Sequence, residues 1–301
     1  LTVVVRIRAR RPANLVGWLT LVVVASLVLG SGGTLAAAEE DETLTVMTFN
    51  LKYADESSDQ PWSRRRPVMR ELLNATAPDV FGTQEGLYRQ LRDIDKDLPG
   101  YDWIGLGRDG GSRGEFMAIF YRRDRLDPLE YDHFWLSDTP DVVASTTWGN
   151  SNRRMVTWVR FRDQNTDREF YFINTHFDHR IQPAREKSAQ LVLERSRKLD
   201  ADLPQILVGD FNSAAGANKA YDILVGDDAF ADTWQTAESR GDEVGTFGGY
   251  RSPRPGGARI DWILTRGPVR TLSTEVITFE QDGQYPSDHY PVIATVEFGT
   301  D

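Results

Sequence analysis

Eight short apolar runs, separated by loops and two helical stretches, constrain the fold of this chain more than any other feature of its sequence. Several are apolar on both faces, as in Ile206-Leu207-Val208, which is typical of strands covered on both sides. Helices are predicted over 63–75, with Ser63 as the N-cap, and over 184–199, where apolar residues share one face. Sheets covered by helices are therefore the expected architecture. The apolar runs occupy residues 44–50, 79–85, 116–122, 155–162, 170–176, 205–212, 258–265 and 290–298.

Chemically capable polar residues stand at the ends of these runs. Strand ends are often polar simply because loops contact water, so no single residue of this kind identifies a site. Together, however, they place carboxylates, amides and imidazoles along one rim of the sheets, where a cleft can form. The residues at run ends are Asn50, Glu85, His176 and Asp210 with Asn212, and the pair Asp288-His289 directly precedes the last run.

Six short motifs around these residues resemble, in order, the successive motifs of the endonuclease/exonuclease/phosphatase superfamily. That superfamily includes pancreatic-type deoxyribonucleases, apurinic endonucleases, deadenylases, neutral sphingomyelinases and inositol polyphosphate 5-phosphatases. The resemblance covers nearly all of residues 39–301 and implies an α/β fold, a four-layer α-β-β-α sandwich of two mixed β-sheets flanked by helices. The motifs are Met47-Thr48-Phe49-Asn50-Leu51, Thr83-Gln84-Glu85-Gly86, Asn174-Thr175-His176-Phe177, Val208-Gly209-Asp210-Phe211-Asn212-Ser213, Arg259-Ile260-Asp261-Trp262-Ile263 and Pro286-Ser287-Asp288-His289-Tyr290-Pro291.

The chemistry that this resemblance implies is metal-assisted hydrolysis of phosphate esters. A phosphate ester resists attack because its oxygens repel the nucleophile, so catalysis consists mainly of positioning and charge neutralisation. Hard oxygen ligands suit Mg²⁺, with Mn²⁺ as the alternative ion. We expect Glu85 to be the metal ligand and Asn50 to orient metal-bound water or phosphate. Asp288 is expected to hold a second metal or to shape its loop.

Five further residues are predicted to carry the proton chemistry. Asp210 would accept a proton from the attacking water or orient it, and Asn212 would donate to a phosphate oxygen. Asp261 resembles the family carboxylate that holds His289 by its other ring nitrogen. Whether this histidine is the base or the donor in the transition state stays open. His176 is the second proton-capable imidazole.

The same motifs could also suggest a calcium or a zinc site, but the sequence disfavours both. Asp-x-Asn also occurs in calcium loops, but no ligand series follows Asp210. A zinc site at His176 and His179 lacks a third nitrogen or sulfur ligand. Magnesium therefore remains the expected cofactor.

Substrate binding is predicted at two arginine clusters and one glutamate. Arg64-Arg65-Arg66 lies at a predicted helix start, where cations oppose the helix dipole. This position suggests either phosphate binding, for which Arg64 is the candidate, or charge pairing with acidic neighbours. Arg153 and Arg154 precede a predicted strand and form the second candidate cluster. Glu115 resembles a position that faces the site in some bacterial members.

The first 38 residues differ from the rest of the chain and predict a signal peptide at residues 1–38. A basic lead, an apolar run over 15–29 and an Ala36-Ala37-Ala38 end are its three parts. The alternative is a retained membrane anchor, but a spanning helix needs about 20 apolar residues and this run is shorter. A lipoprotein is excluded because the chain has no cysteine. We therefore expect a secreted protein, extracellular or periplasmic, with a single catalytic domain over 39–301.

The charge of this expected domain bears on its substrate. The whole chain has 35 basic and 45 acidic residues, a net charge of −10. Without the four arginines of the leader, 31 basic residues face 45 acidic ones and the charge becomes −14. Such acidity opposes long polyanions, so a small phosphorylated substrate is favoured over nucleic acid, the alternative partner. A monomer without stable membrane association is expected, and a non-catalytic binding protein on the same fold is the third interpretation.

Overall fold

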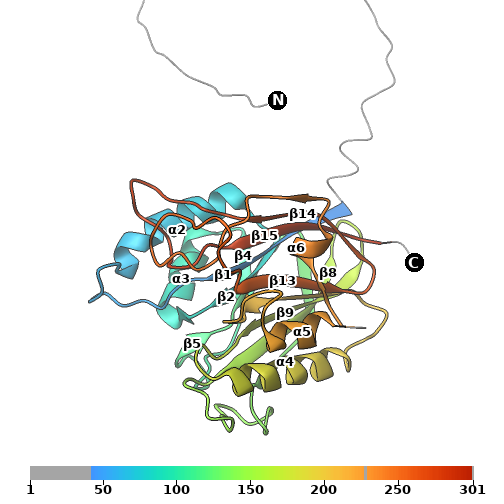
Figure 1. Ribbon diagram of the computed structural model, residues 1–301. Helices are drawn as coiled ribbons and strands as arrows, with labels where there is room; N and C mark the ends of the chain where they lie inside the picture. Colours follow the sequence, from blue (N-terminus) through green and yellow to red (C-terminus); the bar gives the residue numbers. More distant parts are fainter. Residues whose placement is uncertain (1–41, 227–228, 300–301) are drawn as a thin grey trace, which may run out of the picture.

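Two β-sheets lie face to face in the computed structural model, which describes residues 42–226 and 229–299 (Figure 1). The predicted signal peptide lies outside the described residues and stays a prediction. Helices α2 and α3 cover the outer side of one sheet, and α4 and α5 cover the outer side of the other (Figure 1). These are the four layers that the sequence predicts. The helices are α2 (Trp62–Thr76), α3 (Tyr88–Asp97), α4 (Gln182–Ser196), α5 (Lys219–Val225) and the short α6 (Thr233–Thr236).

Both large sheets are mixed. The first has seven strands in the order β12-β14-β15-β1-β2-β6-β4, and the second has six in the order β11-β13-β10-β9-β8-β7. A small ribbon joins β3 (Gly86–Leu87) to β5 (Glu115–Phe116). The first sheet contains β1 (Thr43–Asn50), β2 (Val80–Gln84), β4 (Tyr101–Ile104), β6 (Ile119–Arg122), β12 (Ser239–Arg240), β14 (Val269–Val276) and β15 (Val292–Phe298). The second contains β7 (Leu126–Trp135), β8 (Met155–Asp163), β9 (Glu169–His176), β10 (Gln205–Asp210), β11 (Ala231–Asp232) and β13 (Asp261–Arg266).

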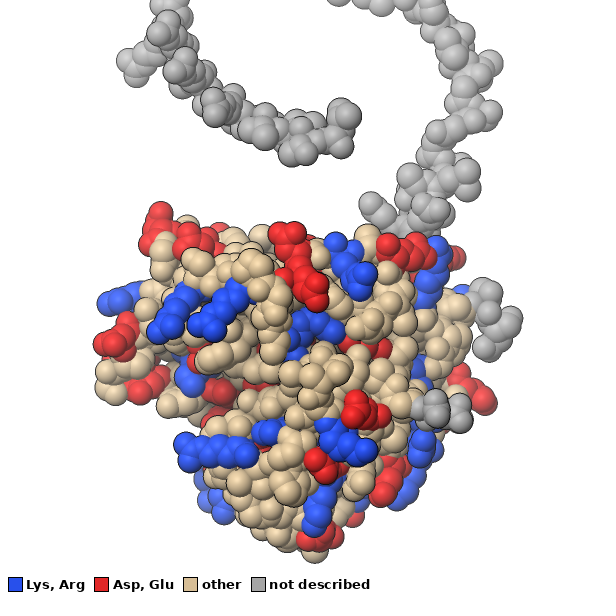
Figure 2. Space-filling view, viewed as in Figure 1, with Lys and Arg blue, Asp and Glu red and all other residues tan. Residues whose placement is uncertain are grey.

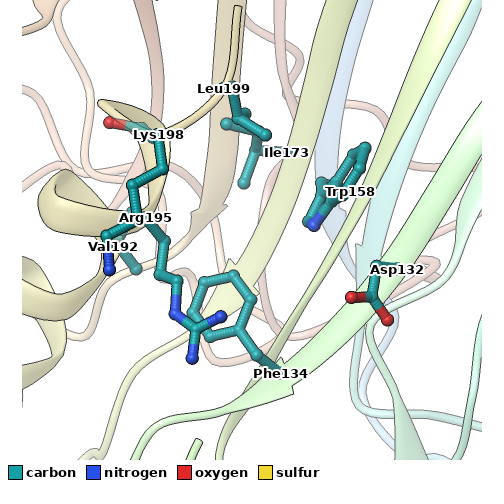
Figure 3. Close-up of a pocket in the computed structure, with 9 residues that line it drawn as sticks. Asp132, Phe134, Trp158, Ile173, Val192, Arg195, Lys198 and Leu199 are labelled. Carbon is teal, nitrogen blue, oxygen red and sulfur yellow. The ribbon is translucent and has the colours of Figure 1, made fainter. Parts of the chain in front are cut away.

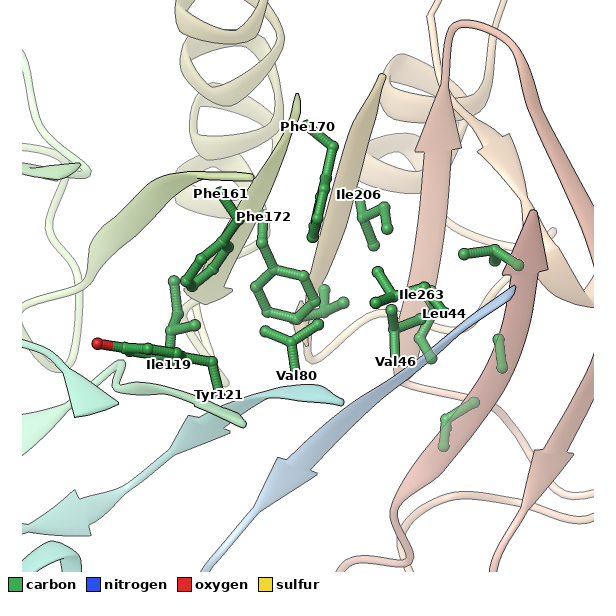
Figure 4. Packing of buried hydrophobic residues seen from close by; sticks show 14 of the residues in the cluster. Leu44, Val46, Val80, Ile119, Tyr121, Phe161, Phe170, Phe172, Ile206 and Ile263 are labelled. Atoms are coloured by element: carbon green, nitrogen blue, oxygen red, sulfur yellow. The ribbon is translucent and has the colours of Figure 1, made fainter. Parts of the chain in front are cut away.

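The strands that are apolar on both faces contact two different parts of the core. In β10, Ile206 and Val208 point into the space between the sheets, while Leu207 packs beneath α4 and α5. Successive side chains of a strand alternate between its faces, so a strand covered on both sides needs apolar residues at every position. Figure 4 shows side chains of both sheets meeting in the inter-sheet core, among them Val80 and Phe172.

Several boundaries differ from the sequence prediction. Helix α2 begins at Trp62 after Pro61, and the Ser63 hydroxyl donates to Glu56 (2.8 Å) instead of capping the helix. Helix α4 begins at Gln182 and ends at Ser196, two and three residues before the predicted limits. The run 116–122 is divided between β5 and β6. The sequence prediction missed β7 because this strand lies at an edge of its sheet, contains Pro128 and exposes most of its side chains.

Among residues 42–226 and 229–299, no helix has the length and apolar character needed to cross a membrane.

Candidate active site

Strand register in the second sheet brings three of the predicted catalytic residues together. Asp210 ends β10 and pairs with His176 at the end of the parallel strand β9. On its other side Asp210 pairs with Asp261, the first residue of the antiparallel strand β13. The three side chains therefore stand on adjacent strands at the same edge of the sheet, and each is almost fully buried.

Asn50 connects this edge to the first sheet. It ends β1 beside Gln84 of β2, so that Glu85 follows directly next to it. The Asn50 amide donates to Glu85 Oε1 (3.1 Å) and to Asp210 Oδ2 (2.9 Å). Asn50 is fully buried and its bond to Asp210 is shielded from water, so an amide that kept neither bond would cost about 1–3 kcal/mol. The two sheets are thus joined at the site.

His289 lies between two carboxylates. Its Nδ1 is 3.0 Å from Asp261 Oδ2, and its Nε2 is 3.8 Å from Asp210 Oδ2. Burial opposes a charge on this ring, but the two carboxylates outweigh burial and raise the pKa of His289 to about 10. The ring is therefore an imidazolium at neutral pH, and Nε2, which is beyond hydrogen-bond distance of Asp210, is free to donate to a substrate.

His176 has a different neighbour at the same ring position. Arg154 Nη1 is 2.8 Å from His176 Nδ1, and a guanidinium has no acceptor. Nδ1 must therefore accept, which leaves the ring proton on Nε2, 3.2 Å from Asp210 Oδ2. The Asn212 amide, which also approaches Nε2, donates to the carbonyl of Phe177 (3.1 Å).

The turn after β10 places Asn212 beside Asp210. Asn212 has a positive φ of 48°, a conformation that asparagine tolerates better than most residues. Its backbone N–H donates to Asp210 Oδ1 (2.9 Å). Gly209 allows the close approach of β10 to β9, because a Cβ there would lie 2.4 Å from the Thr175 carbonyl oxygen.

Oxygen and nitrogen donors that fit a divalent cation surround Glu85. Ligand atoms of Glu85, His176 and Asp210 lie within 4.8 Å of one another. Burial alone would raise the pKa of Glu85, but His176, Lys52 and His289 outweigh burial and lower it to about 2. Glu85 is therefore ionised, as a metal ligand must be. Lys52 Nζ lies 3.6 Å from both Glu85 Oε2 and Asp288 Oδ2. Asp288 therefore lies near Glu85, as the sequence predicts.

These groups open into a cavity of about 390 Å³. Its lining contains predicted residues and others that the sequence prediction missed. The predicted ones are Glu85, Glu115, Arg154, His176, Asp210, Asn212, Asp288 and His289, and the additional ones are Lys52, Tyr53, Asn152, His179, Phe247 and Ile260. Asn50 and Asp261 do not line the cavity, but each forms hydrogen bonds to residues that do.

Comparison with known proteins identifies the family. The sequence profile of the Endonuclease/Exonuclease/phosphatase family matches residues 47–289. The chain belongs to this family. The resemblance noted in the motifs and the predicted fold class are thereby confirmed. Members of the family hydrolyse phosphoester bonds and generally use divalent metal ions.

Two solved structures from Bacteroides thetaiotaomicron resemble the chain over most of its length. An endonuclease/exonuclease/phosphatase family protein is 37% identical, with a TM-score of 0.82, over 86% of this chain and 98% of that chain. A mannosyl-6-phosphatase is 37% identical, with a TM-score of 0.80, over 85% of this chain and 100% of that chain. Among curated sequences, uncharacterised protein L388 of Acanthamoeba polyphaga mimivirus is 32% identical over 160 residues, which are 50% of this chain and 59% of that protein. The chain thus spans less than two thirds of this relative.

Two predicted phosphate-binding arginines of this family member lie outside the cavity. Arg64 is exposed on α2, where Nη1 donates to the carbonyl of Asp59 (3.3 Å). Arg153 is exposed and pairs with Asp109 (3.1 Å). Charge pairing, the alternative considered for the 64–66 cluster, describes Arg66, which binds Asp93 and Asp97.

Arg65, the middle residue of that cluster, is buried and holds the backbone next to the site. Its guanidinium donates to five carbonyl groups, because the loops after β1 and before β15 leave their oxygens without strand partners. The acceptors are the carbonyls of Leu51, Lys52, Tyr53, Gln60 and Pro286.

A second, smaller cavity of about 130 Å³ lies between α4 and strands β7–β9. Figure 3 shows Phe134, Trp158 and Ile173 around it, and Arg195 stands over the Phe134 ring (5.4 Å). Its lining is mainly apolar and includes none of the residues described above. The groups suited to phosphoester chemistry therefore lie in the cavity lined by Glu85, Asp210 and His289.

Proposed function

We propose that this protein is a magnesium-dependent phosphoesterase that hydrolyses the ester of a small phosphorylated molecule. The observation that carries the proposal is the convergence of Glu85, Asp210, Asn212 and His289 on one cavity. These four residues provide a metal ligand, a water-orienting carboxylate, an amide donor and an imidazolium donor.

The donor set around Glu85 suits a hard divalent cation. Glu85 would hold Mg²⁺, with Mn²⁺ as the alternative, and Asn50 and Asp288 would support it. When bound, the ion supplies positive charge that offsets the charge of the phosphate. Glu85 is already ionised and aligned by Asn50, so the protein has little left to rearrange when the cation binds.

The remaining residues position the reacting groups. Burial raises the pKa of Asp210, but His176 and His289 outweigh burial and hold it well below the usual range. Asp210 therefore stays ionised and accepts a hydrogen bond from the attacking water. His289 donates from Nε2 to a phosphate oxygen, where its positive charge opposes the charge that develops. The Asn212 amide lines the same cavity and is placed to donate to a second phosphate oxygen.

Three observations favour a small substrate. The cavity of about 390 Å³ lies within the range of about 300–1,000 Å³ typical of small-molecule sites. Its lysine and arginine residues are Lys52 and Arg154, and the face shown in Figure 2 mixes acidic with basic side chains. The Bacteroides mannosyl-6-phosphatase that resembles this chain acts, by its name, on a sugar phosphate.

A substrate screen with Mg²⁺ tests this proposal. We expect turnover of sugar phosphates or other small phosphate esters, and much less turnover of phospholipids, DNA or RNA. Glu85→Gln should fold normally, bind Mg²⁺ more weakly in calorimetry and lose at least the roughly 10²–10³-fold typical of one transition-state charge interaction. Cleavage of plasmid DNA without turnover of small esters would favour an extracellular nuclease instead. Near wild-type turnover of Glu85→Gln at low Mg²⁺ would contradict the metal assignment.

A further inference from the structure

Part of the cavity lining carries polar groups that the phosphate chemistry does not use. We call it the distal subsite and define it by Glu115, Asn152 and His179, with Arg154 behind them. Glu115 belongs to β5, Asn152 to the loop before β8, and His179 to the loop after β9. Three separate segments therefore build this part of the lining.

Glu115 is unsuited to holding a phosphate, because one anion repels another. It is instead a fixed hydrogen-bond acceptor. Arg108 Nη1 donates to Glu115 Oε2 (2.6 Å), and Arg154 Nη1 lies 3.8 Å from the same oxygen. Within the described part of the chain, no hydrogen bond engages Oε1. That oxygen is left to accept from a ligand.

The same two arginines orient two hydrogen-bond donors. Arg108 Nη2 donates to Asn152 Oδ1 (3.4 Å), which leaves the amide N–H groups of Asn152 for a ligand. Arg154 Nη2 approaches His179 Nδ1 (3.4 Å), and an arginine can only donate. Nδ1 of His179 therefore accepts, and the ring proton stays on the exposed Nε2. Burial, followed by the charge of Arg154, lowers the pKa of His179, which favours the neutral ring.

A buried carboxylate holds this arrangement in place. Asp178 accepts backbone hydrogen bonds from Ser151 (2.7 Å), Arg180 (2.9 Å) and Ile181 (2.8 Å). It thereby ties the loop that carries Asn152 to the loop that carries His179. A site whose groups are fixed before binding loses less entropy when the ligand arrives, so the distal subsite has the properties of a recognition element.

We propose that the distal subsite selects phosphate esters whose alcohol part carries free neighbouring hydroxyl groups, as a sugar does. Glu115 accepts from one hydroxyl, and Asn152 and His179 donate to the oxygens of its neighbours. An alcohol part with a second anionic group is disfavoured by Glu115. This inference rests on the proposed function and adds to it the residues that discriminate between substrates.

The test compares two substrates and two glutamate variants. The substrates are a hexose 6-phosphate and phenyl phosphate, which has the same phosphate but no hydroxyl groups. We expect the wild-type ratio of kcat/KM, hexose over phenyl, to fall at least about 10-fold in Glu115→Gln, the scale of one hydrogen bond to a charged group. The matched control is Glu71→Gln, at an exposed position on α2, which should keep the wild-type ratio.

The failures of the two proposals are distinguishable. If the wild-type protein hydrolyses neither substrate, the small-substrate function itself is wrong and this inference falls with it. If it hydrolyses both, and Glu115→Gln slows both equally or leaves the ratio unchanged, hydroxyl selection by this subsite is wrong. Asn152→Ala provides a second variant, should Glu115→Gln fail to fold, and the same fall in the ratio is expected.

Discussion

The two histidines on opposite sides of the cleft have partners of opposite charge at Nδ1. On one side His289 presents Nδ1 to the carboxylate of Asp261, and on the other His176 presents Nδ1 to the guanidinium of Arg154. A carboxylate accepts a hydrogen bond from the ring N–H and stabilises the positive charge of the ring, whereas a guanidinium forces the ring nitrogen to accept. Both rings reach toward Asp210 through Nε2.

The two histidines therefore differ in the group that contacts Nδ1. The motifs that contain His176 and His289 do not contain Arg154, which lies 22 residues before His176 in sequence. Two histidines with different Nδ1 partners therefore stand on either side of a single carboxylate, Asp210.

We expect the largest loss of kcat from replacing His289 or its carboxylate partner Asp261. His289→Ala should lower kcat by about 10²–10⁴-fold, the usual contribution of a positioned acid–base group. Asp261→Asn leaves the imidazole present but poorly oriented, so its loss should overlap with that of His289→Ala. The double variant should then be little worse than the worse single variant. Fully additive losses in single-turnover kinetics would mean that the two side chains act independently.

The same variant changes the pH at which His289 loses its proton. The pKa of His289 is raised to about 10, so the imidazolium is present at neutral pH and is lost only as the pH rises through about 10. In Asp261→Asn the ring should titrate at a lower pH, although Asp210 still supports its charge. Ring carbon and proton shifts in NMR measure this directly. An unchanged titration would show that Asp261 does not control the charge of His289.

We expect a smaller loss of kcat from replacing Arg154, the guanidinium partner of His176. Arg154→Lys keeps the positive charge but loses the planar fork that reaches both His176 and His179. We expect kcat to fall about 10- to 100-fold, in proportion to the roughly 1.5–3 kcal/mol of a hydrogen bond to a charged group. Nitrogen NMR of the His176 ring should show the proton on Nε2 in the wild type and a mixture of tautomers in the variant.

Arg153→Lys is the matched control for this experiment. Arg153 adjoins Arg154 in sequence but lies outside the cavity and pairs with Asp109, so its replacement should leave kcat and the tautomer unchanged. If Arg154→Lys raised KM while kcat stayed the same, Arg154 would act by charge on the substrate phosphate, as the sequence prediction held, and not by positioning His176.

The strand-borne part of the site follows from the sequence, and the loop-borne part does not. His176, Asp210 and Asp261 occupy register positions on adjacent strands, so motifs that mark the strand ends also mark the site. Lys52, Asn152 and Phe247 lie in loops whose paths depend on tertiary contacts. No periodicity shows that Lys52 reaches Glu85, because its backbone takes a left-handed turn with a φ of 52°.

Arginine was the residue type that local sequence described least well. Arg64, Arg65 and Arg66 are adjacent, yet one is exposed, one binds backbone carbonyls inside the protein and one pairs with α3. Three successive residues of a helix point about 100° apart, so a cluster in sequence is not a cluster in space. The sequence does indicate that these arginines need acceptors, because a cation at a helix start is opposed by the helix dipole. It does not identify the acceptors, because they lie on segments that are distant in sequence.

The smallest effect is expected from salt, and it tests whether cations on the walls of the cleft attract the substrate. Lys52 and Arg154 are the lysine and arginine residues that line the cavity in the described part of the chain, and both already contact other groups of the site. Affinity for duplex DNA falls with a slope of about −0.9 per phosphate contact. One or two contacts would therefore raise KM at most about 3- to 12-fold between roughly 50 and 200 mM salt, whereas five would raise it about 500-fold. The measurement is KM for the best small ester at several salt concentrations, with kcat as the internal control. A steep dependence would show that the substrate extends beyond the cavity onto outer arginines such as Arg64 and Arg153, and would favour a polyanionic substrate despite the acidity of the chain.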